Sequence, residues 1–213
     1  MNVGVPGRIL RRLAAGLIKL VQYLDDGLYM RLYTRHLRAC GMRISGQPLY
    51  IARSVYFDGL DYSHISLGDH VIISSHVSLL THDHSISTAL RAAYGTVLRP
   101  IPLVRGITIG NNCFIGRSAL LLRGCTLGDN VIVGAGSVVR GEIPDNSIVM
   151  GNPAIVVGNT IEWARDKAQQ MDLTGIVPAG GTAQGGPLEN GTKEARDRRP
   201  RRMPGDRGDG QAT

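Results

Sequence analysis

Five of the six histidines in this 213-residue chain lie between positions 64 and 84. Four of them follow one another at intervals of six residues: His64, His70, His76 and His82. Imidazole is a common metal ligand and the usual general base near neutral pH, so this cluster is where the sequence could do chemistry. A fifth histidine, His84, breaks the interval and follows Asp83. The regular interval indicates a periodic backbone that carries these residues.

A six-residue repeat runs through the same region and continues to position 150. From Ile109 the chain divides into IGNNCF, IGRSAL, LLRGCT, LGDNVI, VGAGSV and VRGEIP, with an aliphatic residue first and a small or aliphatic residue fifth. LGDHVI, ISSHVS and LLTHDH keep this register from Leu67, and IARSVY and FDGLDY follow it more loosely from Ile51. Such repeats are typical of a parallel β-helix, in which each unit is a short strand plus a corner. We expect the first and fifth positions to point inward.

The spaced histidines occupy the fourth position of the repeat. The same position elsewhere holds Asn112, Gly124, Asn130 and Gly136. Asn, Gly and His all tolerate left-handed backbone conformation, which favours corners over metal ligands for this series. Only positions 18 apart, such as His64 and His82, are expected to stack. His84 occupies an outward sixth position, where its side chain could meet a substrate.

The repeat also defines the segments around it. We expect a helical arm over residues 1–40, a β-helix domain over 41–158, a short helix over 159–173 and a disordered tail over 174–213. The tail is rich in Gly, Pro and Arg and has too little apolar surface to offset its ordering entropy. Thr81 to Gly106 interrupts the repeat without changing its frame and is predicted to be an extruded, functional loop.

The N-terminal arm combines an apolar stripe with positive charge. Its apolar residues at helical spacing are Leu10, Leu13, Leu17, Leu20, Val21, Leu24, Leu28 and Leu32. Residues 1–40 hold seven Lys or Arg against two Asp, and the longest apolar run is too short to span a bilayer. The arm either packs on a subunit or the open end of the β-helix, or lies on an anionic membrane through residues 1–35. No signal peptide is expected, because no cleavage site follows an apolar core.

Composition excludes several classes of protein. Cys40, Cys113 and Cys125 form no CxxC pair, and the last two fall at inward positions, which indicates buried thiols in a reducing, cytoplasmic compartment. The net charge of +7 is concentrated in the arm, and the core has no basic face interleaved with aromatic residues. A nucleic-acid partner is therefore not expected.

The chain resembles the hexapeptide-repeat acyltransferases, particularly the maltose and galactoside O-acetyltransferases and their relatives in polysaccharide biosynthesis. The matching stretches are LDYSHISLGDHVIISSHVSLLTHDHS from Leu60, ITIGNNCFIGRSALLLRGCTLGDNVIVGAGSVV from Ile107 and EIPDNSIVMGNPA from Glu142. The resemblance implies an all-β fold, a left-handed parallel β-helix, assembled as a homotrimer. It also implies acetyl-CoA as a co-substrate bound between neighbouring subunits, no permanent cofactor and no metal.

The family's catalytic histidine corresponds to His84, which would act as general base while a sugar hydroxyl attacks the thioester directly. Asp58 is the first candidate for the carboxylate that orients this base, and Asp83 is the second. The resemblance places the pantetheine near Phe114, Arg117, Gly134 and Ala135. Many relatives carry a basic residue after the GNPA motif, whereas this chain reads GNPAIVVGN. Arg140, Arg117 or an arginine of the tail could contact the CoA phosphates instead.

Three other functions stay open at this point. The acceptor could be an amine or the hydroxyl of an antibiotic rather than that of a sugar or polysaccharide precursor. The protein could be a γ-class carbonic anhydrase, although this class needs a histidine pair well downstream and no histidine follows His84. It could also be a catalytically inactive scaffold, which would not bind CoA.

Overall fold

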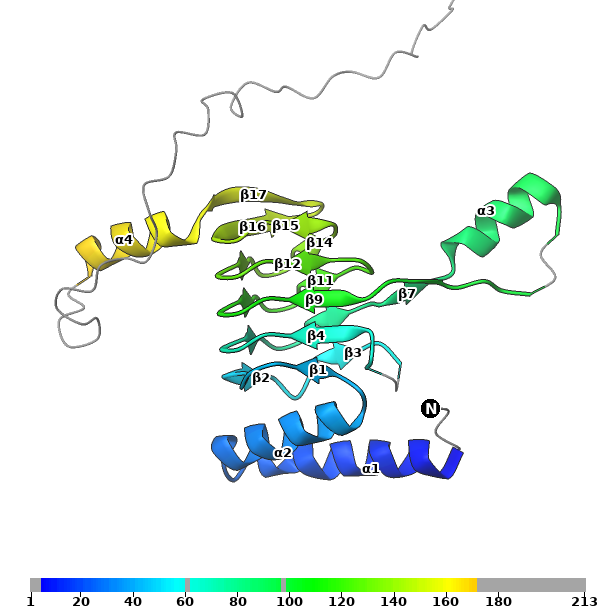
Figure 1. The fold of residues 1–213 in the computed structure, drawn as a ribbon, viewed down its shortest axis with the longest axis horizontal. Helices are drawn as coiled ribbons and strands as arrows, with labels where there is room; N and C mark the ends of the chain where they lie inside the picture. The colour runs from blue at the N-terminus through cyan, green and yellow to red at the C-terminus, as the bar shows by residue number, and fades with distance from the viewer. Residues whose placement is uncertain (1–4, 60–61, 97–98, 172–213) are drawn as a thin grey trace, which may run out of the picture. The chain divides into compact units, whose positions relative to one another are not determined.

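The computed structural model of the chain describes residues 5–59, 62–96 and 99–171. The predicted disordered tail, 174–213, lies outside the described residues. The described strands form a stack of short coils with helices below it and beside it (Figure 1).

Four complete coils make up the β-helix. The first consists of β1 (Arg43–Ile44), β2 (Tyr50–Ile51) and β3 (Tyr56–Phe57), and the second of β4 (Ile65–Leu67), β5 (Ile72–Ile73) and β6 (Ser78–Leu79). The third consists of β9 (Ile107–Ile109), β10 (Phe114–Ile115) and β11 (Leu120–Leu121), and the fourth of β12 (Thr126–Leu127), β13 (Ile132–Val133) and β14 (Val138–Val139). A partial fifth coil contains β15 (Glu142–Ile143) and β16 (Ser147–Gly151).

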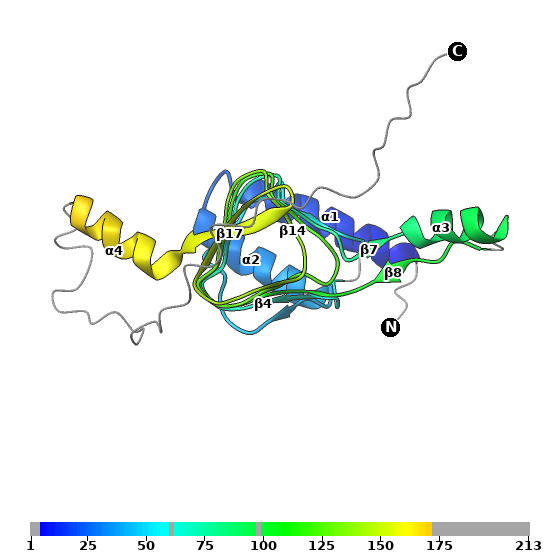
Figure 2. The same cartoon turned by 90° about the horizontal axis from the view of Figure 1, so that it is seen from above.

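Equivalent strands of successive coils pair in parallel and build three sheets. We call them sheet A (β1-β4-β9-β12-β15), sheet B (β2-β5-β10-β13-β16) and sheet C (β3-β6-β11-β14). Partners in adjacent coils of the uninterrupted part are 18 residues apart, as in Phe114 with Ile132 and Leu120 with Val138. Seen from above, the coils superimpose into one outline (Figure 2). The predicted register of three hexads per coil is confirmed.

The core follows the predicted inward positions. First-position residues such as Ile115 and Leu121, and fifth-position residues such as Cys125 and Val131, are fully buried. Small side chains at the fifth position suit the narrow interior of the stack. The predicted burial of Cys113 and Cys125 is confirmed, and the structure describes all three cysteines as free thiols.

The corners explain part of the histidine series. His70 and His76 have positive φ values of 54° and 61°, as do the equivalent Asn112, Ser118, Gly124, Asn130 and Gly136. The predicted corner role is confirmed for these two histidines. It is wrong for His64 and His82, which are not among the described residues with positive φ. His82 belongs to a strand that leaves the stack, so its backbone is extended rather than turned.

The N-terminal arm is two helices rather than one. They are α1 (Val5–Val21) and α2 (Asp26–Ala39), and the side chain of Asp25 caps α2 by accepting a hydrogen bond from the backbone N–H of Leu28. Tyr29, Tyr33 and Leu37 of α2 are buried in the same hydrophobic cluster as the first coil. The predicted capping of the open end is confirmed for α2, which lies under the stack (Figure 1).

The predicted loop over residues 81–106 contains regular structure. After β7 (His82–Asp83) comes helix α3 (Ser85–Tyr94), and β8 (Leu103–Val104) returns antiparallel to β7. The two strands and α3 project sideways from the stack (Figures 1 and 2). Helix α3 was not predicted, although Ile86, Leu90 and Tyr94 stand at helical spacing; of its residues only Ser87 is buried.

At the opposite end, strand β17 (Ala154–Asn159) pairs antiparallel with β16 and closes sheet B. Helix α4 (Thr160–Gln170) follows, as predicted. Its N-terminus is capped by Asn159, whose side chain accepts hydrogen bonds from the backbone N–H groups of Ile161 and Glu162. The antiparallel strand ends the parallel stack.

Candidate active site

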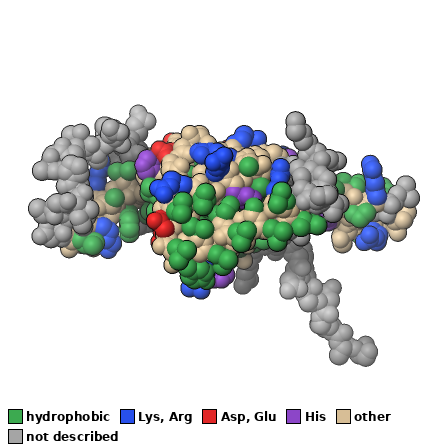
Figure 3. Space-filling model, turned by 90° about the horizontal axis from the view of Figure 1, so that it is seen from below, with side chains coloured by type: hydrophobic (Ala, Val, Ile, Leu, Met, Phe, Trp, Pro, Cys, Tyr) green, Lys and Arg blue, Asp and Glu red, His purple; other side chains and the backbone are tan. Residues whose placement is uncertain are grey.

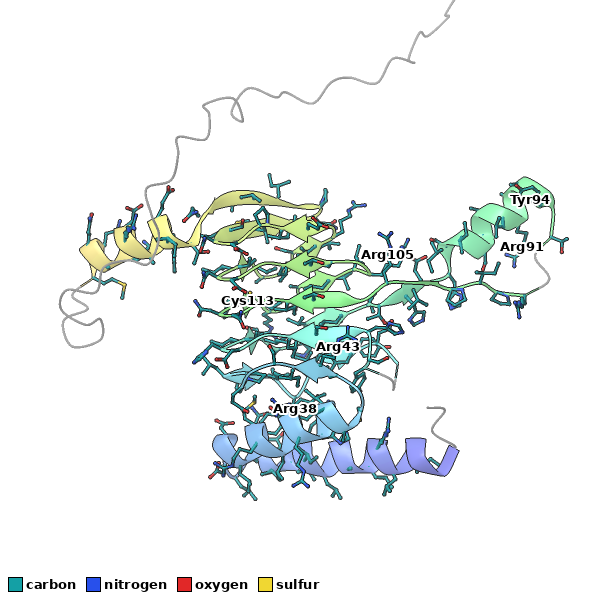
Figure 4. The ribbon with its side chains drawn as sticks, viewed as in Figure 1. Arg38, Arg43, Arg91, Tyr94, Arg105 and Cys113 are labelled. Atoms are coloured by element: carbon teal, nitrogen blue, oxygen red, sulfur yellow. The ribbon has the colours of Figure 1, made fainter. Side chains whose placement is uncertain are left out.

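One corner of the stack gathers most of the polar side chains that could do chemistry. It is the corner that follows sheet C, where each coil turns back toward sheet A. In successive coils this corner carries Asp58, His82, Arg123 and Arg140. The projecting segment leaves from this same corner, and Arg105 marks its base in Figure 4. We call this set of residues the sheet C corner.

Asp58 is the buried centre of the sheet C corner. The residue follows β3 and is only 6% exposed. Its Oδ2 atom accepts hydrogen bonds from the backbone N–H of Thr81 at 3.0 Å, the hydroxyl of Thr81 at 3.2 Å and the backbone N–H of His82 at 3.2 Å. A buried carboxylate needs such donors to offset its lost hydration. Asp58 therefore fixes the start of the projecting segment to the coil below.

The same oxygen also contacts Nδ1 of His82. With Nδ1 carrying the proton donated to Asp58, the Nε2 atom of His82 holds the free lone pair. The His82 side chain as a whole is 41% exposed. A histidine held by a carboxylate in this way has a fixed tautomer and orientation, which is the arrangement of a general base and its orienting group.

Asp58 thus contacts a different histidine from the one predicted. Asp58 was predicted to orient His84, whereas in the structure its carboxylate contacts His82. The reason is geometric: His82 comes directly after the buried Thr81, while His84 lies two residues further out at the first turn of α3. The ring of His84 meets that of His82 edge-on, with the ring centroids 5.6 Å apart. The two histidines and Asp58 therefore form one continuous cluster.

Asp83, the second candidate for orienting the base, has another role. One of its carboxylate oxygens accepts the backbone N–H of Ser85 at 2.9 Å, and the other pairs with Nε of Arg123 from the third coil. The Ser85 hydroxyl and then the Arg123 guanidinium lower the pKa of Asp83 to about 2. Asp83 is therefore ionised at neutral pH and joins the projecting segment to the stack through Arg123.

The predicted cofactor residues lie at two different corners. Arg117, Gly134 and Ala135 belong to the corner between sheets B and C, and Phe114 lies beside them on sheet B. Phe114 and Arg117 are exposed. Arg140 follows β14 and lies at the sheet C corner instead, two coils above His82. Within one chain, sheet C separates Arg140 from the other four residues.

Gly134 has a structural reason to be glycine. A Cβ atom at this position would lie 2.8 Å from Cβ of Met150 in the next coil, which is closer than two carbon atoms can approach. Ala135 and Gly136, which follow, are exposed, so this corner carries no large side chain at 134–136. Such an edge can accept an extended ligand against its backbone groups.

The described part of the chain offers no metal site. Among residues 5–59, 62–96 and 99–171, no group of three or more His, Cys, Asp or Glu side chains is placed to hold an ion. Neither does any described helix have the length and apolar character needed to cross a membrane.

Arg123 and the role of His82 were missed by the sequence analysis. Both residues occupy ordinary places in the repeat, and only the pairing of coils brings them beside Asp83 and Asp58. The sequence did contain a clue to Arg123. When the inserted segment is left out of the count, the repeat places Arg123 one coil above Thr81, where the projecting segment leaves the stack. An arginine at that corner is a natural partner for an aspartate there.

Comparison with known proteins identifies the family. The model of the bacterial transferase hexapeptide (six repeats) matches residues 106–141. Protein CapG of Staphylococcus aureus is 37% identical over 152 residues, which cover 69% of this chain and 86% of CapG. The chain belongs to the hexapeptide-repeat transferase family. This confirms the resemblance on which the fold prediction rested.

Other members of this family are named as acetyltransferases. A sophorolipid acetyltransferase of Starmerella bombicola is 38% identical over 139 residues, covering 65% of this chain and 51% of that protein. The galactoside O-acetyltransferase of Escherichia coli (strain K12) is 34% identical over 116 residues, covering 53% and 54%. The chain thus spans about half the length of these two relatives.

Solved structures of this family share the fold. A galactoside acetyltransferase in complex with coenzyme A matches 78% of this chain and 88% of its own, with a TM-score of 0.53 and 23% identity. A maltose O-acetyltransferase from Clostridium difficile 630 matches 71% and 87%, with a TM-score of 0.51 and 23% identity. The predicted left-handed parallel β-helix is confirmed.

Proposed function

We propose that this protein transfers an acetyl group from acetyl-CoA to a hydroxyl group of a sugar or polysaccharide precursor. The observation that carries the proposal is the cluster of Asp58, His82 and His84 at the base of the projecting segment, in a member of a family whose named relatives are acetyltransferases. The galactoside and maltose enzymes among these relatives favour a sugar hydroxyl over an amine.

In the proposed mechanism His84 is the general base. Its side chain is exposed at the base of the projecting segment and makes no capping hydrogen bond to α3. A neutral imidazole there would accept the proton of the acceptor hydroxyl as the oxygen attacks the thioester carbonyl. The tetrahedral intermediate would then collapse with loss of the CoA thiolate, which takes up a proton. No covalent acyl-enzyme is needed.

His82 and Asp58 are positioning residues in this proposal. Asp58 holds His82 through Nδ1, and the edge of the His82 ring packs against His84. The proposed chain of support therefore runs from a buried carboxylate through one imidazole to the reactive one. An alternative assignment, with His82 as the base, has the Asp58 contact in its favour and reverses the expected ranking of the two histidine variants.

We also propose that the active unit is a homotrimer. The site needs both the sheet C corner, with the histidines, and the corner between sheets B and C, with Phe114, Arg117, Gly134 and Ala135. Sheet C keeps these two corners apart within one chain. Two neighbouring subunits side by side could bring the sheet C corner of one next to the other corner of its neighbour, with acetyl-CoA in the groove between them.

The activity can be tested by measuring the release of CoA thiol from acetyl-CoA in the presence of a panel of sugars. We expect acceptor-dependent release with at least one hydroxyl acceptor and an O-acetyl product by mass spectrometry. A matched panel of amino sugars and aminoglycosides separates the alternatives. Release with amines alone would replace the proposal with N-acetyl transfer, and an absence of CoA binding would indicate an inactive scaffold.

A further inference from the structure

The underside of the protein carries an apolar stripe that no described residue covers. The exposed leucines of this stripe are Leu10, Leu13, Leu17 and Leu20 of α1 and Leu24 just after it, each between 59% and 87% exposed. Their spacing of three and four residues places them on one face of the helix. Ile18, on another side of α1, and Val21, at its end, pack against the hydrophobic core. The leucines consequently point away from the protein.

Basic side chains accompany this leucine stripe. One face of α2 is buried in the core through Tyr29, Tyr33 and Leu37. The opposite, outward face of this helix carries Arg31 and Arg35, which are both exposed. Figure 3, seen from below, shows the hydrophobic side chains gathered across this surface with Lys and Arg groups along its margin. Among described acidic residues, Asp25 and Asp26 lie at the turn between the two helices. The surface combines a leucine face with a mostly cationic edge.

An aromatic residue and a further arginine extend this edge. Tyr23 is exposed beside Leu24, and the guanidinium of Arg53 from the first coil lies 4.2 Å from the centroid of the Tyr23 ring. Leucines on one face, with tyrosine and arginine at the polar boundary, are the composition of helices that lie in a membrane interface. A helix of 17 residues with this pattern can lie on a bilayer, and it is too short and polar to cross one.

From these features we infer that the underside of the protein binds an anionic lipid surface. The leucines of α1 enter the boundary between headgroups and acyl chains, and Arg31, Arg35 and Arg53 meet the lipid phosphates. A second copy of this chain is the competing partner for an apolar stripe. The cationic margin argues against it, because two identical faces would bring the same arginines together.

Vesicle co-sedimentation of the full chain tests the inference. We expect binding to vesicles of equal parts phosphatidylcholine and phosphatidylglycerol, much weaker binding to phosphatidylcholine alone, and release by salt. Leu13→Glu/Leu17→Glu should reduce binding at least about tenfold. The matched control is Leu49→Glu/Tyr94→Glu, which adds the same charge at residues that are 54% and 76% exposed outside this face. It should bind within about twofold of the unmodified chain, since two added charges act only weakly at a distance.

Two further measurements keep the inference falsifiable. Arg31→Glu/Arg35→Glu should lose the preference for anionic vesicles, and it remains informative if the leucine variant fails to fold. Sedimentation velocity of each variant without lipid reports self-association. Failure of the unmodified chain to bind anionic vesicles, or equal binding by the leucine variant and its control, would overturn the inference. A smaller assembly for the leucine variant alone would assign the stripe to a contact between copies.

Discussion

Nδ1 of His82 donates to the carboxylate of Asp58, and this contact joins two successive coils of the stack. The same carboxylate oxygen holds the backbone N–H groups of Thr81 and His82, so the projecting segment begins from a fixed point. His84 follows two residues later. The position of the proposed base therefore depends on Asp58, which lies one coil below and 24 positions before the His82 that it holds.

The first prediction concerns the ranking of the two histidines. His84→Ala should lower kcat by about 10²- to 10⁴-fold with acetyl-CoA binding retained, because a general base is lost. His82→Ala and Asp58→Asn should each cost less, about 10- to 100-fold, since they only displace the base. The double variant Asp58→Asn/His82→Ala should be no worse than either single variant, because both act through one contact. A larger loss for His82→Ala than for His84→Ala would move the base to His82.

A second prediction tests the shared site through mixed assemblies. His84→Ala disables the sheet C corner, and Arg117→Glu is expected to disable the corner between sheets B and C. Each variant alone should be nearly inactive. The two variants are then unfolded and refolded together in equal amounts. In the resulting trimers, about a quarter of the subunit interfaces combine an intact sheet C corner with an intact corner between sheets B and C. Activity should therefore return to about a quarter of that of the unmodified protein.

Mixing without refolding is the control for this experiment and should restore nothing if subunits do not exchange. Sedimentation equilibrium should give the mass of three chains for the unmodified protein. A fully active monomer, or no recovery in the refolded mixture of two well-folded variants, would contradict the shared site.

The third prediction concerns the anchor between Asp83 and Arg123. Arg123→Ala should increase the rate of proteolysis within residues 85–94 by about two- to fivefold, because exposed ion pairs contribute only modestly. The same variant should have lower activity, while the thermal stability of the stack is retained. Arg91→Ala, on the far part of the same projecting segment (Figure 4), is the matched control and should leave both properties unchanged. Equal proteolysis of the two variants would show that the ion pair does not restrain the segment.

Thiol chemistry gives a fourth prediction. Burial raises the pKa of Cys113 to about 11 and that of Cys125 to about 12, and it also raises the pKa of Cys40. A raised thiol pKa disfavours the reactive thiolate at pH 8, and all three side chains are inaccessible. A colorimetric disulfide reagent should therefore label none of them within minutes in the native protein and all three in guanidinium chloride. Rapid labelling of the native protein would show that the stack opens readily.

The fifth prediction tests the capping of the stack by α2. Leu37 is 1% exposed in the core cluster beneath the first coil, so Leu37→Ala should lower the free energy of unfolding by about 2–5 kcal/mol. Leu13→Ala, in the exposed leucine stripe, should change it by less than about 0.5 kcal/mol. Urea unfolding followed by circular dichroism measures both. Similar values for the two variants would show that α2 does not complete the core.

The repeat predicted the stack because each of its rules is local. An aliphatic residue opens each hexad, a small residue stands fifth, and a residue that tolerates positive φ stands at the corner, as Asn112 and Gly124 do. These requirements recur every six residues and can be read without knowing which coil pairs with which. The prediction failed where the chain leaves the repeat, at His82 and in α3, because no periodic burial constrains those residues.

The site was only partly predictable for the same reason. Asp58 and His84 could be predicted as site residues from their positions in the sequence. Their contacts could not, because these depend on which corners of successive coils lie above one another. The pairs Asp58 with His82 and Asp83 with Arg123 cross coils and have no signature in the local sequence. The two helices of the arm were predicted as one because the turn at Asp25 leaves the apolar spacing almost unbroken.

The spacing of the coils also sets the height of the histidine cluster above the underside of the protein. Adjacent coils lie about 4.8 Å apart, and a helix layer is about 10 Å thick, so the histidine cluster on the second coil lies on the order of 20 Å above the leucine stripe of α1. Parallel hydrogen bonds fix the spacing of the first two coils, and the buried residues of α2 hold this helix against the first coil. If the underside binds lipid, this height decides which hydroxyl groups can reach the site. A hydroxyl at the membrane surface would lie below the site, whereas one carried further out on the same headgroup would reach it.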